Sequence, residues 1–451
     1  MRAIVSCGVV AMLVVGGVLA GTPQPTNTFI IKGLPANLAQ EVVAAGGSLL
    51  RTHPQIGYAV AMSEDPDFAA NLKGAPGVAG VQQDLMVQWV PSADASSLGT
   101  VQAQGSDPDP TTAFFYPCQW NMSQIDAPAA WDAGVFGANM QVAVLDTGVD
   151  PSHQDLAGKV DEDDSTSMLT PGSSACNAIL GLPDEETYYD FNFHGTFVSS
   201  QITGNGLGMA SVAPDAEIVA VKVLNCTGNG SFADVIAGIL YAADLPAVQV
   251  INMSLGAYFP KNSIGGGQLL GAMSAAVNYA NSKGKLVVTA AGNDYANLDK
   301  DKNYVSLPAQ AGTSASIYAT DILDEVADYS NFGRSGTWVG APGGGDDPAE
   351  PLAGCPLPAS GQGGIVGACS TYSPFFSCGP TSYLYGGTGT SFASPIAAGV
   401  AALMDGNFDG ALNGGQLTVG LANTADDLGK KGVDGIYSHG RVNAGNAAAA
   451  H

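Results

Sequence analysis

From about residue 114 onward, the chain alternates short apolar runs with longer helical patterns. Each run carries apolar side chains at consecutive positions, so both faces of the predicted strand are buried. Strands of this kind form a parallel sheet that helices cover on two sides. The predicted fold is therefore α/β, with a doubly wound, mostly parallel sheet. The strand-like runs are 141–146, 217–224, 248–255 and 285–292, and the helical patterns are 231–245, 266–284 and 391–404.

Three segments precede this region. Residues 1–20 have one Arg, a long apolar run and small residues at the end, which is typical of a secretory signal peptide. Residues 21–91 predict a β-α-β-β-α-β order, a small α+β unit of the ferredoxin-like type. Residues 92–113 are rich in Ser, Asp, Gly and Pro, and we interpret them as an exposed linker. The main domain is then 114–451.

The charge of the chain excludes some partners. Lys and Arg number 15 against 40 Asp and Glu, which gives a net charge of −25. Such a chain is a poor candidate for binding nucleic acid or anionic membranes. After removal of the signal peptide we expect no membrane association, because no later apolar segment is long enough to cross a bilayer. We expect a monomer.

Cysteine usage also fits export. Cys7 would leave with the signal peptide, and an even number of cysteines remains, at 118, 176, 226, 355, 369 and 378. An even count in an exported chain predicts disulfides. If all of them pair, at least one bridge ties the region 355–378 to another part of the chain. The pairing is otherwise open.

Polar residues lie at the ends of several predicted elements. Asp146 ends a buried strand, His194 and Ser391 each open a helix, and Asn293 follows another strand. A serine hydroxyl needs a base within hydrogen-bond reach, and the base needs an acid that fixes its tautomer. Taken singly, these residues are more simply explained as turns and helix caps. Their occurrence together at the boundaries of one α/β domain favours nucleophilic catalysis.

The segment 114–448 resembles the catalytic domain of the subtilisin family of serine proteases, with features of its proteinase K branch. The motifs that carry the resemblance include VAVLDTGVDPSHQDL, HGTFVSSQI, VINMSLG, VTAAGN and GTSFASP. The resemblance implies that Asp146 orients His194, that His194 acts as general base and then acid, and that Ser391 is the nucleophile. It also implies that Asn293 and the Ser391 N–H stabilise the oxyanion, in an enzyme that cuts polypeptides.

The same resemblance implies a set of substrate contacts. Two segments would clamp an extended peptide by strand addition. A third, with small side chains, would line the pocket for the residue before the cut and leave room for an apolar or aromatic group. We expect no acidic residue near Ser306, at the base of this pocket. The clamp residues are Gly228, Asn229, Gly230, Ser254, Leu255 and Gly256, and the pocket residues are Ala290, Ala291 and Gly292.

Residues 21–91 resemble the inhibitory propeptide of the family, which implies that their last strand lies in the cleft until a cut within 91–113. The alternative is an independent binding domain. The chemistry requires no cofactor, and no metal ligand set is assigned. A structural calcium is left open, either at Asp155 or in the acidic run 161–164. The insertion 344–386 is either a disulfide-pinned rim of the cleft or surface decoration.

The sequence thus predicts a secreted serine endopeptidase that is inhibited by its own propeptide. A non-catalytic peptide-binding protein on the same scaffold is the alternative. A dedicated processing enzyme for one partner protein would differ from a general protease only in specificity.

Overall fold

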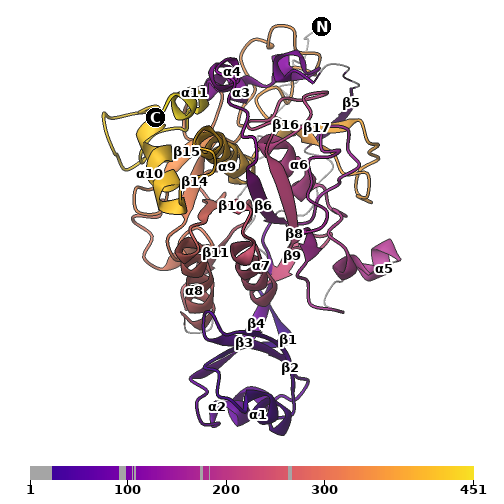
Figure 1. Cartoon of the computed structure of the whole chain (residues 1–451), viewed down its shortest axis with the longest axis vertical. Helices are drawn as coiled ribbons and strands as arrows, with labels where there is room; N and C mark the ends of the chain where they lie inside the picture. Colours follow the sequence, from indigo (N-terminus) through magenta and orange to yellow (C-terminus); the bar gives the residue numbers. More distant parts are fainter. Residues whose placement is uncertain are drawn as a thin grey trace, which may run out of the picture.

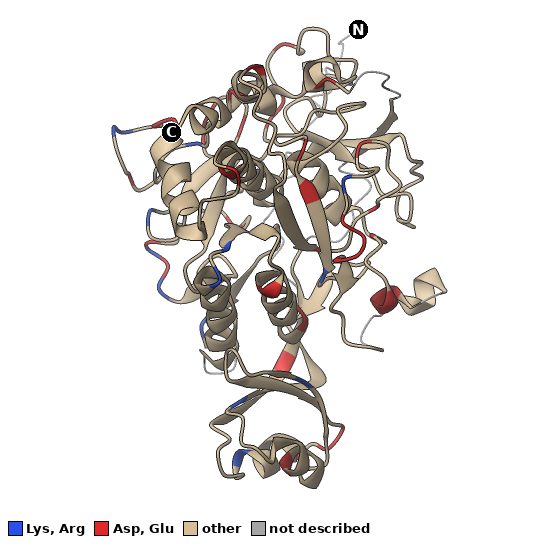
Figure 2. Cartoon of the chain, viewed as in Figure 1, with Lys and Arg blue, Asp and Glu red and all other residues tan. Residues whose placement is uncertain are grey.

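The computed structural model describes residues 23–90, 98–103, 105, 108–172, 176–181, 183–262 and 267–450. The predicted signal peptide lies outside the described residues. Among the described helices, none combines the length and the apolar character that crossing a bilayer requires. Acidic positions outnumber basic ones and are spread over the whole chain (Figure 2).

The N-terminal unit is a small antiparallel sheet with two helices on one face (Figure 1). Its strands pair in the order β2-β3-β1-β4, and the outer strand β4 also pairs antiparallel with β9 of the main domain. The buried side chains of the two helices, among them Val42 and Phe68, form its own small core. Its elements are β1 (Gln24–Lys32), α1 (Leu38–Ala44), β2 (Ser48–His53), β3 (Tyr58–Met62), α2 (Phe68–Lys73) and β4 (Gly80–Gln88).

The main domain is built on a seven-stranded sheet with the order β15-β14-β12-β10-β6-β8-β7. All of its pairings are parallel. The four runs predicted from the sequence lie at the centre of this sheet. The strands are β6 (Gln141–Asp146), β7 (Thr166–Ser167), β8 (Glu217–Lys222), β10 (Val248–Met253), β12 (Leu286–Ala290), β14 (Ala315–Thr320) and β15 (Val339–Pro342).

Helices cover both faces of the sheet, each over its own core (Figure 1). On β6, Val142 and Val144 face one core while Ala143 and Leu145 face the other. This alternation explains why residues 142–145 are all apolar, and the predicted doubly wound α/β fold is confirmed. On the first side lie α4 (Ala127–Asp132), α6 (His194–Ile202), α9 (Thr390–Asn407), α10 (Gly414–Thr424) and α11 (Ala444–Ala449), and on the second α7 (Phe232–Asp244) and α8 (Gln268–Ser282).

The remaining elements border the sheet. Strand β5 falls inside the predicted linker. Thr100 and Gln102 are exposed, but Ala103 after the strand is only 5% exposed, so the expectation that 92–113 is exposed is wrong at that residue. These elements are β5 (Gly99–Gln102), η1 (Pro110–Thr112), η2 (Tyr116–Cys118), α3 (Trp120–Gln124), α5 (Asn177–Leu180), η3 (Asp184–Glu186), β9 (Asn229–Ser231), β11 (Ala257–Pro260), β13 (Tyr304–Leu307), β16 (Ile365–Ala368) and β17 (Ser382–Gly387).

The six cysteines between residues 118 and 378 form three disulfides. The pairs are Cys118–Cys355, Cys176–Cys226 and Cys369–Cys378. The first ties the region 355–378 to the start of the main domain, as the count of cysteines required. One disulfide therefore ties the insertion 344–386 to the start of the main domain and a second closes a loop within the insertion, which contributes β16 and most of β17 to the domain.

Candidate active site

Asp146 and His194 meet at the carboxyl end of β6. The Nδ1 atom of His194 lies 2.9 Å from Oδ1 and 3.0 Å from Oδ2 of Asp146. A carboxylate only accepts hydrogen bonds, so Nδ1 is the donor and the neutral ring keeps a lone pair on Nε2. Nε2 is buried and has no hydrogen-bond partner in the described part of the chain. The ring is thus oriented as a base with a free acceptor.

A network of small polar groups holds this pair in place. Thr147 follows Asp146; its Oγ1 accepts from the Gly195 N–H at 2.9 Å and donates to Asp190 at 2.8 Å. Asp190 also accepts from both the N–H and the hydroxyl of Thr196. A Cβ atom on Gly195 would lie 2.0 Å from the Gly148 oxygen, so only glycine lets α6 start this close to β6. Burial raises the pKa of Asp190, and its hydrogen bonds oppose that shift.

Ser391 lies in the first turn of α9 and is 7% exposed. The residue that precedes the helix is Gly389, and no side chain caps this end. The simpler explanation of Ser391 as a helix cap therefore does not apply. The ring of Phe392, the next residue, is centred 5.8 Å from the His194 ring. The Ser391 hydroxyl is not bonded to Nε2 here, and such bonds are often long in enzymes without substrate.

The side chain of Asn293 is fixed beside Ser391. Its Oδ1 accepts from the backbone N–H and the hydroxyl of Thr390, both at 2.9 Å. This leaves Nδ2 as a donor without a partner among the described residues. A Cβ atom on Gly389 would lie 3.6 Å from Nδ2 and 3.7 Å from the Ser391 nitrogen. Glycine thus keeps the space in front of both donors empty.

The two predicted clamp segments both contact the end of the N-terminal unit. Strand β9 pairs antiparallel with β4, with Gly230 opposite Val87 and Asn229 opposite Gln88. Gly228 accepts from the Trp89 N–H at 3.1 Å, and Gly256 donates to the Trp89 oxygen at 2.9 Å. Ser254 and Leu255, next to Gly256, are buried. The chain at Trp89 is therefore hydrogen-bonded on both sides, like an inserted strand.

The side chain of Trp89 fills an apolar pocket of the main domain. Its ring makes edge contacts with Phe232 at 5.1 Å and Phe259 at 5.9 Å. Its Nε1 donates to the Gly230 oxygen at 2.9 Å, so the only polar atom of the ring is satisfied. Such an aromatic anchor contributes more to binding than the surrounding contacts.

The predicted pocket wall, Ala290 to Gly292, begins at the last residue of β12 and is close to one acidic side chain. The Ala291 oxygen accepts from Ser306 Oγ at 2.8 Å and from Asn331 at 2.9 Å. A Cβ atom on Gly292 would lie 3.3 Å from the Asp294 carboxylate. The expectation of a site without a nearby acid is thus wrong, because a turn after Asn293 folds Asp294 back to the wall. Burial raises the pKa of Asp294.

Carboxylates at both candidate calcium positions accept hydrogen bonds from the chain. Asp155 accepts from the N–H groups of residues 207–209 and from the Tyr383 hydroxyl at 2.5 Å. A ring of hydrogen donors does not fit a cation, which needs acceptors. In the run 161–164, Asp161 accepts from the backbone of Asp163 and Asp164 and closes a turn.

One further group of metal-type ligands occurs in the described ranges, formed by Cys176, Asp184 and Cys226. Its two cysteines form a disulfide, and Asp184 pairs with Lys222 at 2.8 Å. This group therefore does not fit a metal ion either. No residue is assigned to a metal.

Comparison with known proteins decides the family. The subtilase family model matches residues 137–440, which carry Asp146, His194 and Asn293 as well as Ser391. The chain belongs to the subtilase family. Thermitase from Thermoactinomyces vulgaris is 33% identical over 338 residues, 74% of this subtilase and 97% of thermitase. Subtilisin Savinase from Lederbergia lenta is 32% identical over 327 residues, 72% of this subtilase and 96% of Savinase.

The fold is also found in solved structures. A crystal structure of the epidermin leader peptide processing serine protease from Staphylococcus aureus superimposes with a TM-score of 0.74 at 21% identity, covering 94% of this subtilase and 98% of that chain. At this identity the likeness concerns the fold alone. Family membership makes this subtilase a serine endopeptidase that acts on polypeptides. The resemblance to the proteinase K branch stays a prediction.

Sequence reasoning missed several residues around the site. Thr390 holds Asn293, and Asp190 joins the turn after Asp146 to the start of α6. The signal for Thr390 was its position next to Ser391 in the motif GTSFASP. For Asp190 and Asp294 the sequence offered no signal beyond a carboxylate near a site residue.

Proposed function

We propose that this subtilase hydrolyses peptide bonds with Ser391 as nucleophile, His194 as general base and Asp146 as the acid that orients the ring. The observation that supports this most strongly is the His194 ring, whose Nδ1 is bonded to Asp146 while Nε2 is buried without a partner. An imidazole in that state takes a proton from a hydroxyl that approaches Nε2.

In the first step, Ser391 Oγ attacks the peptide carbonyl and its proton moves to His194 Nε2. Asp146 stabilises the imidazolium that forms. The oxyanion is bound by Asn293 Nδ2 and by the Ser391 N–H at the start of α9, where the helix dipole favours negative charge. His194 then protonates the leaving amine, and water releases the acyl group by the reverse sequence. No metal or cofactor takes part.

We propose an apolar or aromatic preference for the residue before the cut. Ala290 and Ala291 are small and buried, which supports a pocket with room for a large side chain. Asp294 accepts from Asn331 at 3.2 Å and its pKa is raised, so it favours a basic substrate residue less than a free carboxylate would. Digestion of a peptide library tests this preference. Cuts after many apolar residues indicate a general protease, and a single narrow motif indicates a dedicated processing enzyme.

We propose that residues 21–91 are an inhibitory propeptide of an exported precursor, with 1–20 as its signal peptide. Trp89 is hydrogen-bonded between Gly228 and Gly256 in the manner of a substrate strand, and this supports inhibition. The disulfides support export to an oxidising compartment. An independent binding domain would have no reason to end in the clamp.

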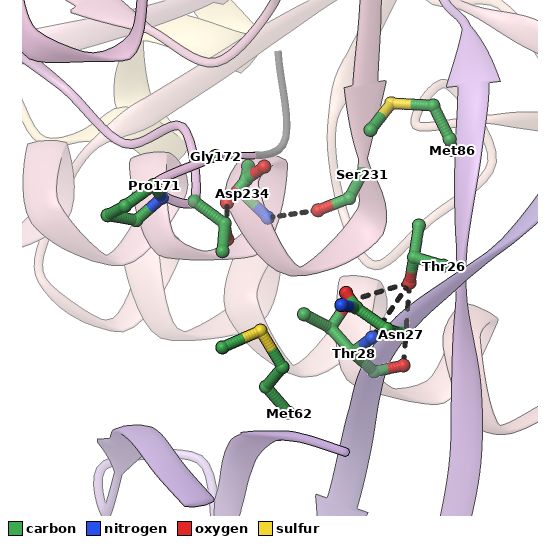
Figure 3. A pocket seen from close by; sticks show the side chains of 10 residues that line it. Thr26, Asn27, Thr28, Met62, Met86, Pro171, Gly172, Ser231 and Asp234 are labelled. Atoms are coloured by element: carbon green, nitrogen blue, oxygen red, sulfur yellow. Dashed lines mark hydrogen bonds between the residues drawn. The ribbon is translucent and has the colours of Figure 1, made fainter. Parts of the chain in front are cut away.

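The contact between the N-terminal unit and α7 contains two buried carboxylates. Asp84, on β4, accepts from the Ala233 N–H at 3.2 Å and from Thr28, and it faces Asp234. Asp234 pairs with Arg51 at 3.3 Å and accepts from Thr170. Figure 3 shows Thr26 and Thr28 of the N-terminal unit across a small pocket from Ser231 and Asp234. Burial, and then the Asp234 charge, raise the pKa of Asp84 to about 7.

This arrangement predicts a pH-dependent association. A carboxyl whose pKa is higher in the docked state takes up a proton on docking, so docking weakens as pH rises from about 4 to 7. We expect the unfolding free energy of full-length Ser391→Ala protein to fall over this range more steeply than that of the Ser391→Ala, Asp84→Asn double variant. Chemical denaturation at several pH values measures both. Parallel curves would contradict the prediction. Asp67→Asn, at an exposed position, is the control.

The proposed activity is tested by comparing the parent with Ser391→Ala and with Ser282→Ala, an exposed serine on α8. The parent and Ser282→Ala are expected to digest denatured casein, while Ser391→Ala does not. A parent that binds peptides without cutting them, and that behaves like Ser391→Ala, would favour the alternative of a non-catalytic binding protein.

A further inference from the structure

Strand β5 lies on the free edge of β17, immediately before the nucleophile. The two strands pair antiparallel, with Gly99 opposite Tyr385 and Gln102 opposite Ser382. β17 ends at Gly387 and α9 begins at Thr390, so this edge leads directly to Ser391. An edge with unpaired N–H and C=O groups is where an extended peptide would add. Here the chain itself already fills it.

The chain is docked on both sides of the candidate catalytic residues. On one side of these residues, the backbone N–H groups of Trp89 and Val90 both donate to the Gly228 oxygen. On the other side of these residues, Leu98 packs against an aromatic cluster that includes Phe193, Phe376 and Phe392. The Phe193 and Phe392 rings are centred 6.1 and 5.8 Å from the His194 ring. Figure 1 shows α6, which carries His194, between β9 and β5. Leu98 therefore lies on the primed side, which receives residues after the cut.

The residues that follow Leu98 in the chain make specific contacts with the main domain. A substrate segment, whose sequence varies, could not make the same contacts. A Cβ atom on Gly99 would lie 2.0 Å from the Tyr385 ring, so a larger residue there would displace the ring or the strand. Ala103 is buried; its N–H donates to the Thr381 oxygen at 3.1 Å, and its oxygen accepts from Gln154 at 2.7 Å. Further along, Phe115 is fully buried and donates its N–H to Gly208. This stretch is built into the main domain.

We propose that residues 98–103 stay with the enzyme after the propeptide leaves and permanently close the β17 edge of the primed side. The proposal rests on the proposed proteolytic function. It places the maturation cut before Leu98. The strand is tethered to an anchored segment, so its effective concentration is about millimolar or higher, and a substrate does not displace it. The preferred substrates are polypeptides recognised by residues before the cut, with little gain from a long segment after it.

Two measurements on the matured enzyme test the proposal. N-terminal sequencing is expected to find a first residue no later than Leu98, and any later start would overturn the proposal. In the second measurement, two peptides share the residues before the cut and carry either two or eight residues after it. For the parent we expect kcat/KM values that agree within about threefold, since the extra residues find no free edge.

Gly99→Val is expected to push β5 away from Tyr385 and open the edge. The long peptide should then gain at least tenfold in kcat/KM over the short one, while the short peptide is cut as by the parent. Thr100→Val, with an exposed side chain on the same strand, should keep the parent ratio. A parent that already prefers the long peptide tenfold would overturn the proposal, as would a Gly99→Val enzyme with an unchanged ratio. Cleavage of the short peptide reports the proposed function separately.

Discussion

His194→Ala is expected to lower kcat by on the order of 10⁶-fold, with KM little changed. The substrate clamp does not involve this ring, so binding should persist while proton transfer is lost. Because we expect the variant to remain full length with Trp89 in the clamp, kcat and KM are measured after an unrelated protease has removed residues 21–91. Hydrolysis of a chromogenic peptide and gel analysis of the precursor measure the two effects.

The matched control for this change is His439→Ala. His439 packs on Trp338, with ring centres 4.4 Å apart, and belongs to another part of the domain. It should mature and cut like the parent, provided that thermal unfolding shows a folded protein. A His194→Ala protein that matures at the parent rate would contradict the assignment of the general base.

The second large effect is expected at Asn293. Asn293→Ala should lower kcat by about 10²–10³-fold and leave KM nearly unchanged, because the lost hydrogen bond forms only with the oxyanion of the transition state. The Ser391 N–H remains, so slow maturation and residual activity are expected. Steady-state kinetics on the matured variant separate kcat from KM.

Thr390→Val is a useful companion to Asn293→Ala. It removes the hydroxyl that donates to Asn293 Oδ1 at 2.9 Å but keeps the Nδ2 donor. A smaller loss in kcat is therefore expected, of about one order of magnitude or less. Asn278→Ala, at an exposed position on α8, should have no effect on kcat or KM. If Asn293→Ala raised KM and left kcat intact, its side chain would be a binding group rather than an oxyanion donor.

The sequence predicted the central sheet because its strands are buried on both faces. Val142 and Ala143 face opposite cores, and a strand in that position has to be apolar throughout. Among the bordering strands, β5 and β17 were not predicted. β5 and β17 contain glycines such as Gly99 and Gly387 and polar residues that resemble a linker pattern. Their stability comes from pairing with distant segments, which no local pattern reports.

The candidate catalytic residues were predicted from the sequence, but the residues around them were not. Asp146 and His194 lie at element ends, where a motif can be read from neighbouring residues, and they are in contact in the structure. The residues that fix them are harder to find. Asp190 acts through Thr147, 43 positions earlier in the chain. Asp294 reaches the pocket wall through a local turn. Both contacts depend on side-chain directions that spacing alone does not determine.

Labelling with a fluorophosphonate, followed by mass spectrometry of the modified peptide, tests the central claim most directly. The reagent reacts with a serine only where a base activates the hydroxyl. We predict a single label on Ser391 of the matured protein and no label on His194→Ala. A label on a different serine, or equal labelling of Ser391 in His194→Ala, would contradict the proposed roles of His194 and Ser391.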